Sequence, residues 1–163
     1  MNRIFTAAKG LTVPDGTIVH PILDPTALSH SAGEWAEAMS IALGRIPPHT
    51  TSKIHLHPIV TQVTWVISGQ LRVVMKDQAS DVPYALDLTA EQAALTLPGT
   101  FFQLINSGDA ECRVLYIVAP AFVFDVGPGG EVLYNDAVVL DSEWHELAAA
   151  RWAVASLNDL ESI

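Results

Sequence analysis

The chain has 163 residues, of which half are hydrophobic and only 16% are charged, so it can form one globular domain with a hydrophobic core. This composition excludes an intrinsically disordered protein. Eighteen acidic residues against eight basic ones give a formal net charge of −10, and we therefore expect neither nucleic acid nor an anionic membrane surface as a partner.

Glycine and proline recur throughout residues 1–33, a pattern that favours short strands and turns over long helices. Asp15-Gly16 is a turn signal, and the residues after it have strand propensity. Residues 34–46 contain alanine and glutamate, which favour a helix, but they match helical periodicity poorly. We predict a strand over 36–46, ended by the two prolines that follow, because proline has no amide hydrogen to donate to a sheet.

The middle of the chain reads as a succession of short strands. Turn signals recur about every 8 to 12 residues from position 47 to 120, the spacing of an all-β sandwich or barrel. The predicted strands cover residues 59–67, 71–76, 84–88, 91–97, 100–106 and 111–118. We expect the first two of them to form a hairpin around Gly69.

After more strand and loop, the end of the chain is predicted to be helical. The pattern of apolar residues favours an α-helix over about 142–157, which Asp141 or Ser142 can cap. Trp144 and Trp152 share a face of this helix, and we expect them to pack against the barrel or against a partner subunit.

The only cysteine, Cys112, lies in a predicted strand, where we expect it to act as a small buried hydrophobic residue. An intramolecular disulfide is therefore impossible. The first residues contain no apparent cleavage signal, and no stretch approaches the roughly 18 apolar residues that a membrane helix needs. We expect a cytoplasmic protein.

Two of the six histidines, His55 and His57, are separated by one residue just before the strongest strand signal. Residues i and i+2 of a strand project from the same face, so both imidazoles can point at one site. Neutral imidazole is a favoured ligand of several transition metals. The alternative is a pair of solvated histidines on an edge strand.

The histidine pair stands in a longer pattern that resembles the first motif of the cupin superfamily. That motif is Gly, five residues, His-x-His, three or four residues, Glu, six residues, Gly. The corresponding positions of this chain hold His49, His55, His57, Gln62 and Gly69. The second cupin motif, Gly, five residues, Pro-x-Gly, two residues, His, three residues, Asn, resembles a segment that contains Pro98, Gly99, Phe102 and Asn106.

The resemblance implies an all-β fold, the double-stranded β-helix or jelly-roll barrel, over about residues 36–120. Extra strands would precede the barrel and the C-terminal α-helix would follow it, within a single domain of residues 1–163. Because cupins commonly dimerise, the resemblance also implies a homodimer.

The resemblance further implies where a metal would bind. In metal-binding cupins the ligands are the two histidines and the glutamate of the first motif and the histidine of the second. Carried over, these positions are His55 and His57, Gln62 in place of glutamate, and Phe102 in place of histidine. A carboxamide keeps an oxygen that can coordinate, whereas phenylalanine removes a ligand. The expected cofactor is a divalent transition metal (Zn, Fe, Ni, Cu or Mn), with a metal-free pocket or a vestigial site as alternatives.

Other residues could supply the missing ligand. Gln103 follows Phe102 but would point to the opposite face of its strand unless a bulge intervenes. The remaining candidates are His20, His30, His49, Asn106 and Tyr116.

Strand alternation also predicts the wall of the pocket. Residues that share a face with the metal-binding positions, or that come from neighbouring strands, are Thr64, Phe102, Asn106 and Tyr116. They are uncharged and partly aromatic, which favours a neutral or aromatic small molecule as the ligand. The resemblance then implies a metal-dependent isomerase, cyclase, lyase or dioxygenase, with unassigned catalytic residues. The alternative is a non-catalytic metabolite-binding or sensing cupin.

Overall fold

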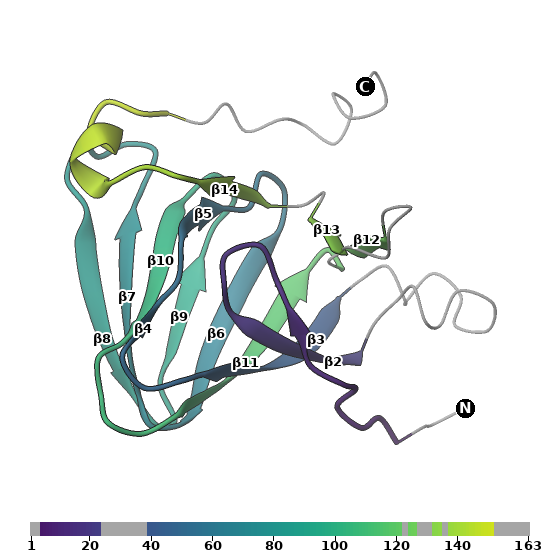
Figure 1. Ribbon diagram of the computed structural model, residues 1–163. Coiled ribbons are helices and arrows are strands. Elements are labelled where there is room, and N and C mark those ends of the chain that lie inside the picture. Colours follow the sequence, from purple (N-terminus) through teal and green to yellow (C-terminus); the bar gives the residue numbers. More distant parts are fainter. Residues whose placement is uncertain (1–3, 24–38, 122–123, 127–131, 135–136, 152–163) are drawn as a thin grey trace.

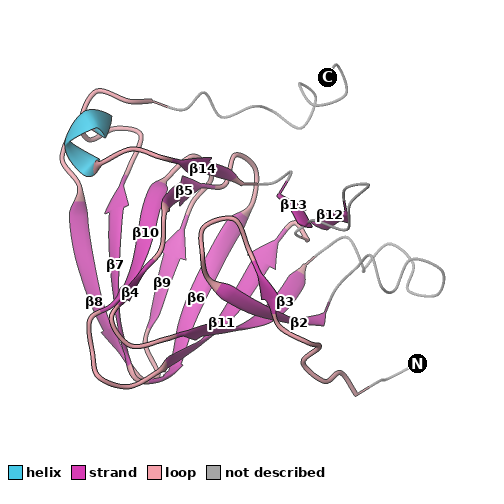
Figure 2. Ribbon diagram, in the orientation of Figure 1, coloured by secondary structure: helices cyan, strands magenta, loops and turns pink. Residues whose placement is uncertain are grey.

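The computed structural model describes residues 4–23, 39–121, 124–126, 132–134 and 137–151. Two six-stranded antiparallel sheets face each other and form a jelly-roll barrel, which confirms the predicted all-β fold (Figures 1 and 2). No helix in this part of the chain has the length and apolarity needed to cross a membrane.

The first sheet contains, in spatial order, β1 (Leu11–Thr12), β2 (Ile18–Leu23), β3 (Ser40–Ile46), β11 (Cys112–Ala119), β6 (Thr61–Ser68) and β9 (Ala93–Thr96). The second contains β14 (Val138–Leu140), β5 (Ile54–Leu56), β10 (Phe101–Asn106), β7 (Gln70–Lys76) and β8 (Tyr84–Thr89), with β4 (Thr50–Thr51) beside β10. A separate two-stranded ladder joins β12 (Phe124–Val126) to β13 (Val132–Tyr134).

The side chains between the two sheets make the main core, and burial alternates along the strands as the sequence pattern predicts. On β6, Gln62, Thr64 and Val66 are at most 5% exposed, whereas the intervening Trp65 is 46% exposed. Leu71, Val73 and Met75 face them from β7, and Cys112 is fully buried between the sheets. The alternation directs the polar side chains of β6 into the barrel, where they can contribute to a site.

The predicted hairpin around Gly69 is wrong. β6 pairs with β11 and β9, whereas β7 pairs with β10 and β8, so the turn carries the chain from one sheet to the other. Gly69 has φ 87°, and a Cβ atom there would lie 2.9 Å from the backbone of Cys112. Because β6 and β7 occupy opposite sheets, their buried faces meet across the core instead of sharing one surface.

The predicted C-terminal α-helix is not seen in the described residues. A single 3-10 turn, Trp144–Leu147, takes its place, and residues 152–157 lie outside the described part of the chain. Tertiary contacts explain the short turn. The Trp144 indole nitrogen donates to Gln103 Oε1 at 2.9 Å, and the fully buried Lys76 donates from Nζ to the Ala150 carbonyl at 2.8 Å. These two anchors hold the segment against the outer face of β10 and β7.

Candidate functional site

A pocket lies between the sheets, and its lining residues come from the turn before β2 and from β2, β3, β5, β6, β10 and β11. Its empty volume is about 550 Å³, a value that includes the solvent space at its open mouth. Apolar side chains dominate the wall: Val19, Pro21, Leu23, Ile41, Ala42, Leu104, Tyr116 and Val118. The polar lining consists of Asp15, Thr17, Ser40, His55, His57 and Gln62. Such a cavity suits a small organic ligand that is oriented by a few polar contacts.

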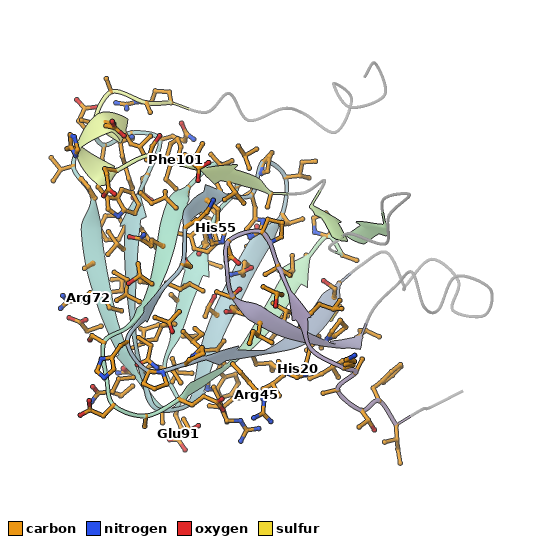
Figure 3. All side chains as sticks on the ribbon, in the orientation of Figure 1. His20, Arg45, His55, Arg72, Glu91 and Phe101 are labelled. Carbon is orange, nitrogen blue, oxygen red and sulfur yellow. The ribbon has the colours of Figure 1, made fainter. Side chains whose placement is uncertain are left out.

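β5 directs His55 into this pocket. The flanking Ile54 and Leu56 belong to the apolar cluster under the C-terminal segment, so the intervening residue faces the barrel interior. Figure 3 shows the His55 side chain between the two sheets, and it is 4% exposed. His55 Nδ1 donates to the Lys53 carbonyl at 3.0 Å, which leaves Nε2 to face the pocket.

The ring of His55 favours its neutral form. Burial lowers the pKa of His55, and this effect exceeds the opposing influence of the Asp15 carboxylate and the Lys53 carbonyl, which both raise that pKa. Because Nδ1 holds the proton of the neutral ring, Nε2 carries a lone pair. The imidazole is therefore in the state that accepts a hydrogen bond or binds a metal ion.

His57 follows β5 directly and lines the same pocket at 3% exposure. The centroids of its ring and the His55 ring lie 5.6 Å apart in an edge-on arrangement. The His57 carbonyl accepts from the Gly99 amide at 2.8 Å, so the segment after β5 is tied to the turn before β10. The structure thus brings the two histidines together in a buried wall.

Gln62, Thr64 and Phe102 surround the histidine pair in different ways. Gln62 lines the pocket and donates from Nε2 to Thr64 Oγ1 at 3.0 Å, a bond that does not involve its carbonyl oxygen. Thr64 is buried behind it and is not part of the pocket wall. Phe102 pairs with His55 across the β5–β10 ladder, and its ring centroid lies 4.0 Å from that of His55 and 5.4 Å from that of His57. The phenyl ring packs against both imidazoles beneath the pocket.

Tyr116 lines the pocket, whereas Asn106 lies elsewhere. A glycine in β3 makes room for the tyrosine, because a Cβ atom on Gly44 would lie 2.4 Å from its ring. Asn106 Nδ2 donates to the backbone carbonyls of Ile46, Pro47 and Ala110 at 2.9–3.1 Å. The asparagine therefore holds together the turns around β3 and β10, away from the pocket wall.

The other candidates for a third ligand lie away from the pocket wall or outside the described residues. Gln103 contacts Ser52 and Trp144 on the outer side of β10, as strand alternation predicts. His20 donates to the Ala8 carbonyl, and His49 pairs with Asp109 at the surface. His30 is not among the described residues.

Sequence reasoning missed three polar pocket residues, Asp15, Thr17 and Ser40, of which Asp15 is the ionisable one. Asp15 is 4% exposed, and its Oδ2 lies 3.6 Å from His55 Nε2. Oδ1 accepts from the amide and the hydroxyl of Thr17 at 3.0 and 2.9 Å. The Asp-Gly signal predicts this local turn. It does not predict the contact with β5, because that contact joins segments 40 residues apart in the sequence.

The charges of the site are few. The pocket wall contains Asp15 as its single acidic residue and no lysine or arginine among the described residues. Arg45, Lys53 and Arg72 near the strand ends are instead paired with Glu111, Asp141 and Asp87. In the described ranges, no three His, Cys, Asp or Glu side chains converge closely enough to hold a metal ion by themselves.

Comparisons with known proteins agree with this architecture. The chain is similar in structure to oxalate decarboxylase from Lactobacillus farciminis in complex with formate, with TM-score 0.60, 15% identity, and coverage of 82% of this chain and 33% of that one. It is also similar to a recombinant oxalate oxidase in complex with glycolate, with TM-score 0.57, 20% identity, and coverage of 74% and 59%.

A third similar structure is Drosophila melanogaster CENP-C bound to CAL1, with TM-score 0.55, 14% identity, and coverage of 70% of this chain and 81% of that one. At these identities the likeness shows the fold alone. The chain spans about a third of the length of the oxalate decarboxylase and 59% of that of the oxalate oxidase. No curated protein matches its sequence.

The family model described as "Cupin domain" matches residues 42–118, a segment that runs from β3 to β11 and contains both histidines of the site. The jelly-roll barrel and the similar structures agree with this match, which identifies residues 42–118 as a cupin domain.

Proposed function

We propose that the chain binds a small neutral or aromatic organic molecule in the pocket, at a divalent transition metal ion held by His55, His57 and Gln62. The observation that supports this most is the placement of two buried imidazoles and a carboxamide on the wall of a mostly apolar cavity. A small organic ligand or an ion that enters this cavity would meet these few polar groups on a mostly apolar wall.

The donor set suits such an ion. Neutral imidazole nitrogen and amide oxygen are ligands of zinc, nickel, copper, iron and manganese. His55 has its Nδ1 hydrogen bonded to a backbone carbonyl, the arrangement by which proteins orient metal-binding imidazoles. When bound, the ion polarises an oxygen of the ligand as a Lewis acid, the chemistry of an isomerase, cyclase or lyase.

The charges of the pocket support a neutral ligand. The similar oxalate decarboxylase and oxalate oxidase are named for a dicarboxylate, and their structures hold formate and glycolate. The pocket here contains the carboxylate of Asp15 and no basic side chain among its described lining residues. Figure 3 shows Arg45 and Arg72 pointing away from the interior. A dianionic ligand would lie beside the Asp15 carboxyl group, and no cationic side chain in the described wall would offset its charge.

The second candidate function is ligand binding without a metal. The Phe102 ring packs 4.0 Å from the His55 ring, at the position where the motif of metal-binding cupins has a histidine. In this alternative the imidazoles act as hydrogen-bond partners of an organic ligand. The pocket would then capture or sense a metabolite without breaking a bond.

Calorimetry on chelator-treated protein distinguishes the two. Zn²⁺ is titrated first, and then acetophenone and benzoate, two aromatic ligands of similar size that differ in charge. We expect about one Zn²⁺ per chain and tighter binding of acetophenone than of benzoate. Acetophenone binding without Zn²⁺ binding would favour the metal-free candidate. If neither binds, the proposed function is wrong.

We also propose that the chain forms a homodimer through the outer faces of β6 and β9. Trp65 and Ile67 of β6, Leu95 of β9 and Leu97 directly after it are 42–56% exposed, and neither strand contains a charged residue. On a chain of net charge −10, an uncharged apolar surface lets two copies meet with little like-charge repulsion.

We expect light scattering to give a dimer for the wild type and a monomer for Trp65→Arg, because the new charge would be buried in the interface. Val82→Arg is the matched control, since Val82 is 70% exposed but lies outside these two strands. A monomeric wild type, or equal dissociation of both variants, would contradict the proposed interface.

A further inference from the structure

We propose that the Tyr116 ring, which lies over Gly44, sets the size of the ligand, so that the pocket takes a molecule with a single aromatic ring. The inference rests on the proposed small-molecule function and adds to it the class of the ligand and the side chain that selects it. It requires neither a bound metal ion nor the ionisation of any group in the pocket.

Two neighbouring strands of the first sheet make room for this ring. Gly44 is opposite Val114 in the β11–β3 ladder and is two residues from the partner of Tyr116. Gly44 is therefore a diagonal neighbour of Tyr116, at a distance that an aromatic side chain can reach. A Cβ atom on Gly44 would lie 2.4 Å from Cε2 and 2.8 Å from Cζ of the tyrosine. The ring thus fills the space that any side chain at position 44 would need.

The same ring is part of the pocket wall. Tyr116 lines the pocket at 7% exposure. Two further lining residues border the space over Gly44: Val19, which is opposite Gly44 on β2, and Ala42, two residues before it on β3. Removal of the ring would therefore extend the cavity over the glycine.

The polar groups of the pocket place the ligand beside this ring. Gln62 is opposite Val118 in the β6–β11 ladder, and Tyr116 is two residues along β11 on the same face. A ligand whose oxygen meets Gln62 and the histidine pair lays its apolar part against Val118 and Tyr116. An aromatic ring packs well there against the phenol ring. A second, fused ring would need the space over Gly44, which Tyr116 fills.

The test compares two ketones that share a polar group, acetophenone with one ring and acetonaphthone with two. Calorimetry with Zn²⁺ present measures their dissociation constants. We expect the wild type to bind acetophenone at least about tenfold more tightly than acetonaphthone. Tyr116→Ala should reverse this preference, because the second ring then becomes buried over Gly44. Tyr116→Leu, a smaller change to the core, should shift the preference in the same direction, whereas the conservative Tyr116→Phe should not.

Gly44→Ala tests the same contact from the neighbouring strand. The added methyl group would displace the Tyr116 ring towards the cavity, so acetophenone should bind about tenfold more weakly. In the Tyr116→Ala background the same substitution should have little effect on binding, because the displaced ring is absent. Val114 Cγ2 would lie 2.7 Å from the new Cβ atom, so a loss of stability is expected in both backgrounds.

The matched control is Gly108→Ala, in the loop between β10 and β11. The nearest atom to a Cβ there is Asn106 Oδ1 at 3.4 Å, so the methyl group fits with little displacement. We expect this variant to bind both ketones like the wild type. Near-ultraviolet circular dichroism and urea unfolding verify the fold and stability of every variant.

The outcomes separate this inference from the proposed function. If the wild type prefers acetonaphthone, or if Tyr116→Ala and Tyr116→Leu keep the wild-type preference, the ring does not select the ligand. An equal effect of Gly44→Ala in both backgrounds would likewise mean that the ring only stabilises the sheet by covering a glycine. Each of these results overturns the inference and leaves the proposed pocket intact. If the wild type binds neither ketone, the proposed function and this inference are both wrong.

Discussion

Replacing His55 and His57 together by alanine is expected to abolish metal binding to the pocket. Both imidazoles are at least 96% buried in its wall, and alanine offers no donor atom. Loss of two ligands should weaken Zn²⁺ binding by more than about a hundredfold, because removal of an outer-shell partner alone often costs ten- to a hundredfold. Elemental analysis of protein purified without an affinity tag and calorimetric titration measure the effect.

The control for the double variant is His145→Ala. His145 is an exposed imidazole in the 3-10 turn Trp144–Leu147, so its loss removes a possible surface ligand and leaves the pocket intact. We expect this variant to retain the wild-type metal content. Equal metal content in the double variant would place the bound ion elsewhere on the protein and would overturn the proposed site.

Replacing Phe102 by histidine is expected to tighten metal binding. The Phe102 ring lies 4.0 Å from the His55 ring and 5.4 Å from the His57 ring, so an imidazole at this position adjoins both ligands. A further ligand should lower the Zn²⁺ dissociation constant on the order of ten- to a hundredfold. Titration of the chelator-treated variant with Zn²⁺ in competition with a coloured chelator measures this change.

The same substitution one residue earlier is the matched control. Phe101 is 3% exposed, but it faces the outer apolar cluster with Ile54, Leu56 and Leu147 instead of the pocket. Phe101→His should therefore carry a similar folding penalty, about 1–3 kcal/mol for burying a polar ring, without tighter Zn²⁺ binding. Equal Zn²⁺ affinity of Phe102→His and the wild type would show that position 102 does not adjoin a bound ion.

Zn²⁺ should also reverse the folding penalty of Phe102→His. An ion that binds only the folded state stabilises it in proportion to the logarithm of its concentration. The midpoint of urea unfolding should therefore rise more with added Zn²⁺ in Phe102→His than in Phe101→His. A rise of the same size in both variants would contradict a ligand role for position 102.

The alternation of inward-facing and outward-facing residues along each strand could be predicted from the sequence for much of the barrel. One face of each strand must be apolar to fill the core, so alternation places Gln62, Thr64 and Val66 inside and Trp65 outside. The same period of two places His55 and His57 on one wall. These features depend only on neighbours in the sequence, and the cupin motifs add the turns that close the strands into a barrel.

Pairing between distant segments could not be predicted in the same way. The turn at Gly69 suits a hairpin by its local chemistry, yet β6 and β7 belong to opposite sheets. The tail has helix propensity, but Trp144 and Ala150 meet partners on β10 and β7 that hold it in a short 3-10 turn. In both cases burial against a distant strand outweighs a weak local preference.

The sequence by itself determined the strands, the inward-facing histidine pair and the cupin barrel, because side-chain alternation and turn chemistry are local properties. Only the tertiary structure decided what surrounds the pair. It brings Asp15 to 3.6 Å from His55 and packs Phe102 beneath both imidazoles. It also places Asn106 among backbone carbonyls outside the pocket. These contacts arise when the two sheets close on each other, and no short-range pattern in the chain encodes them.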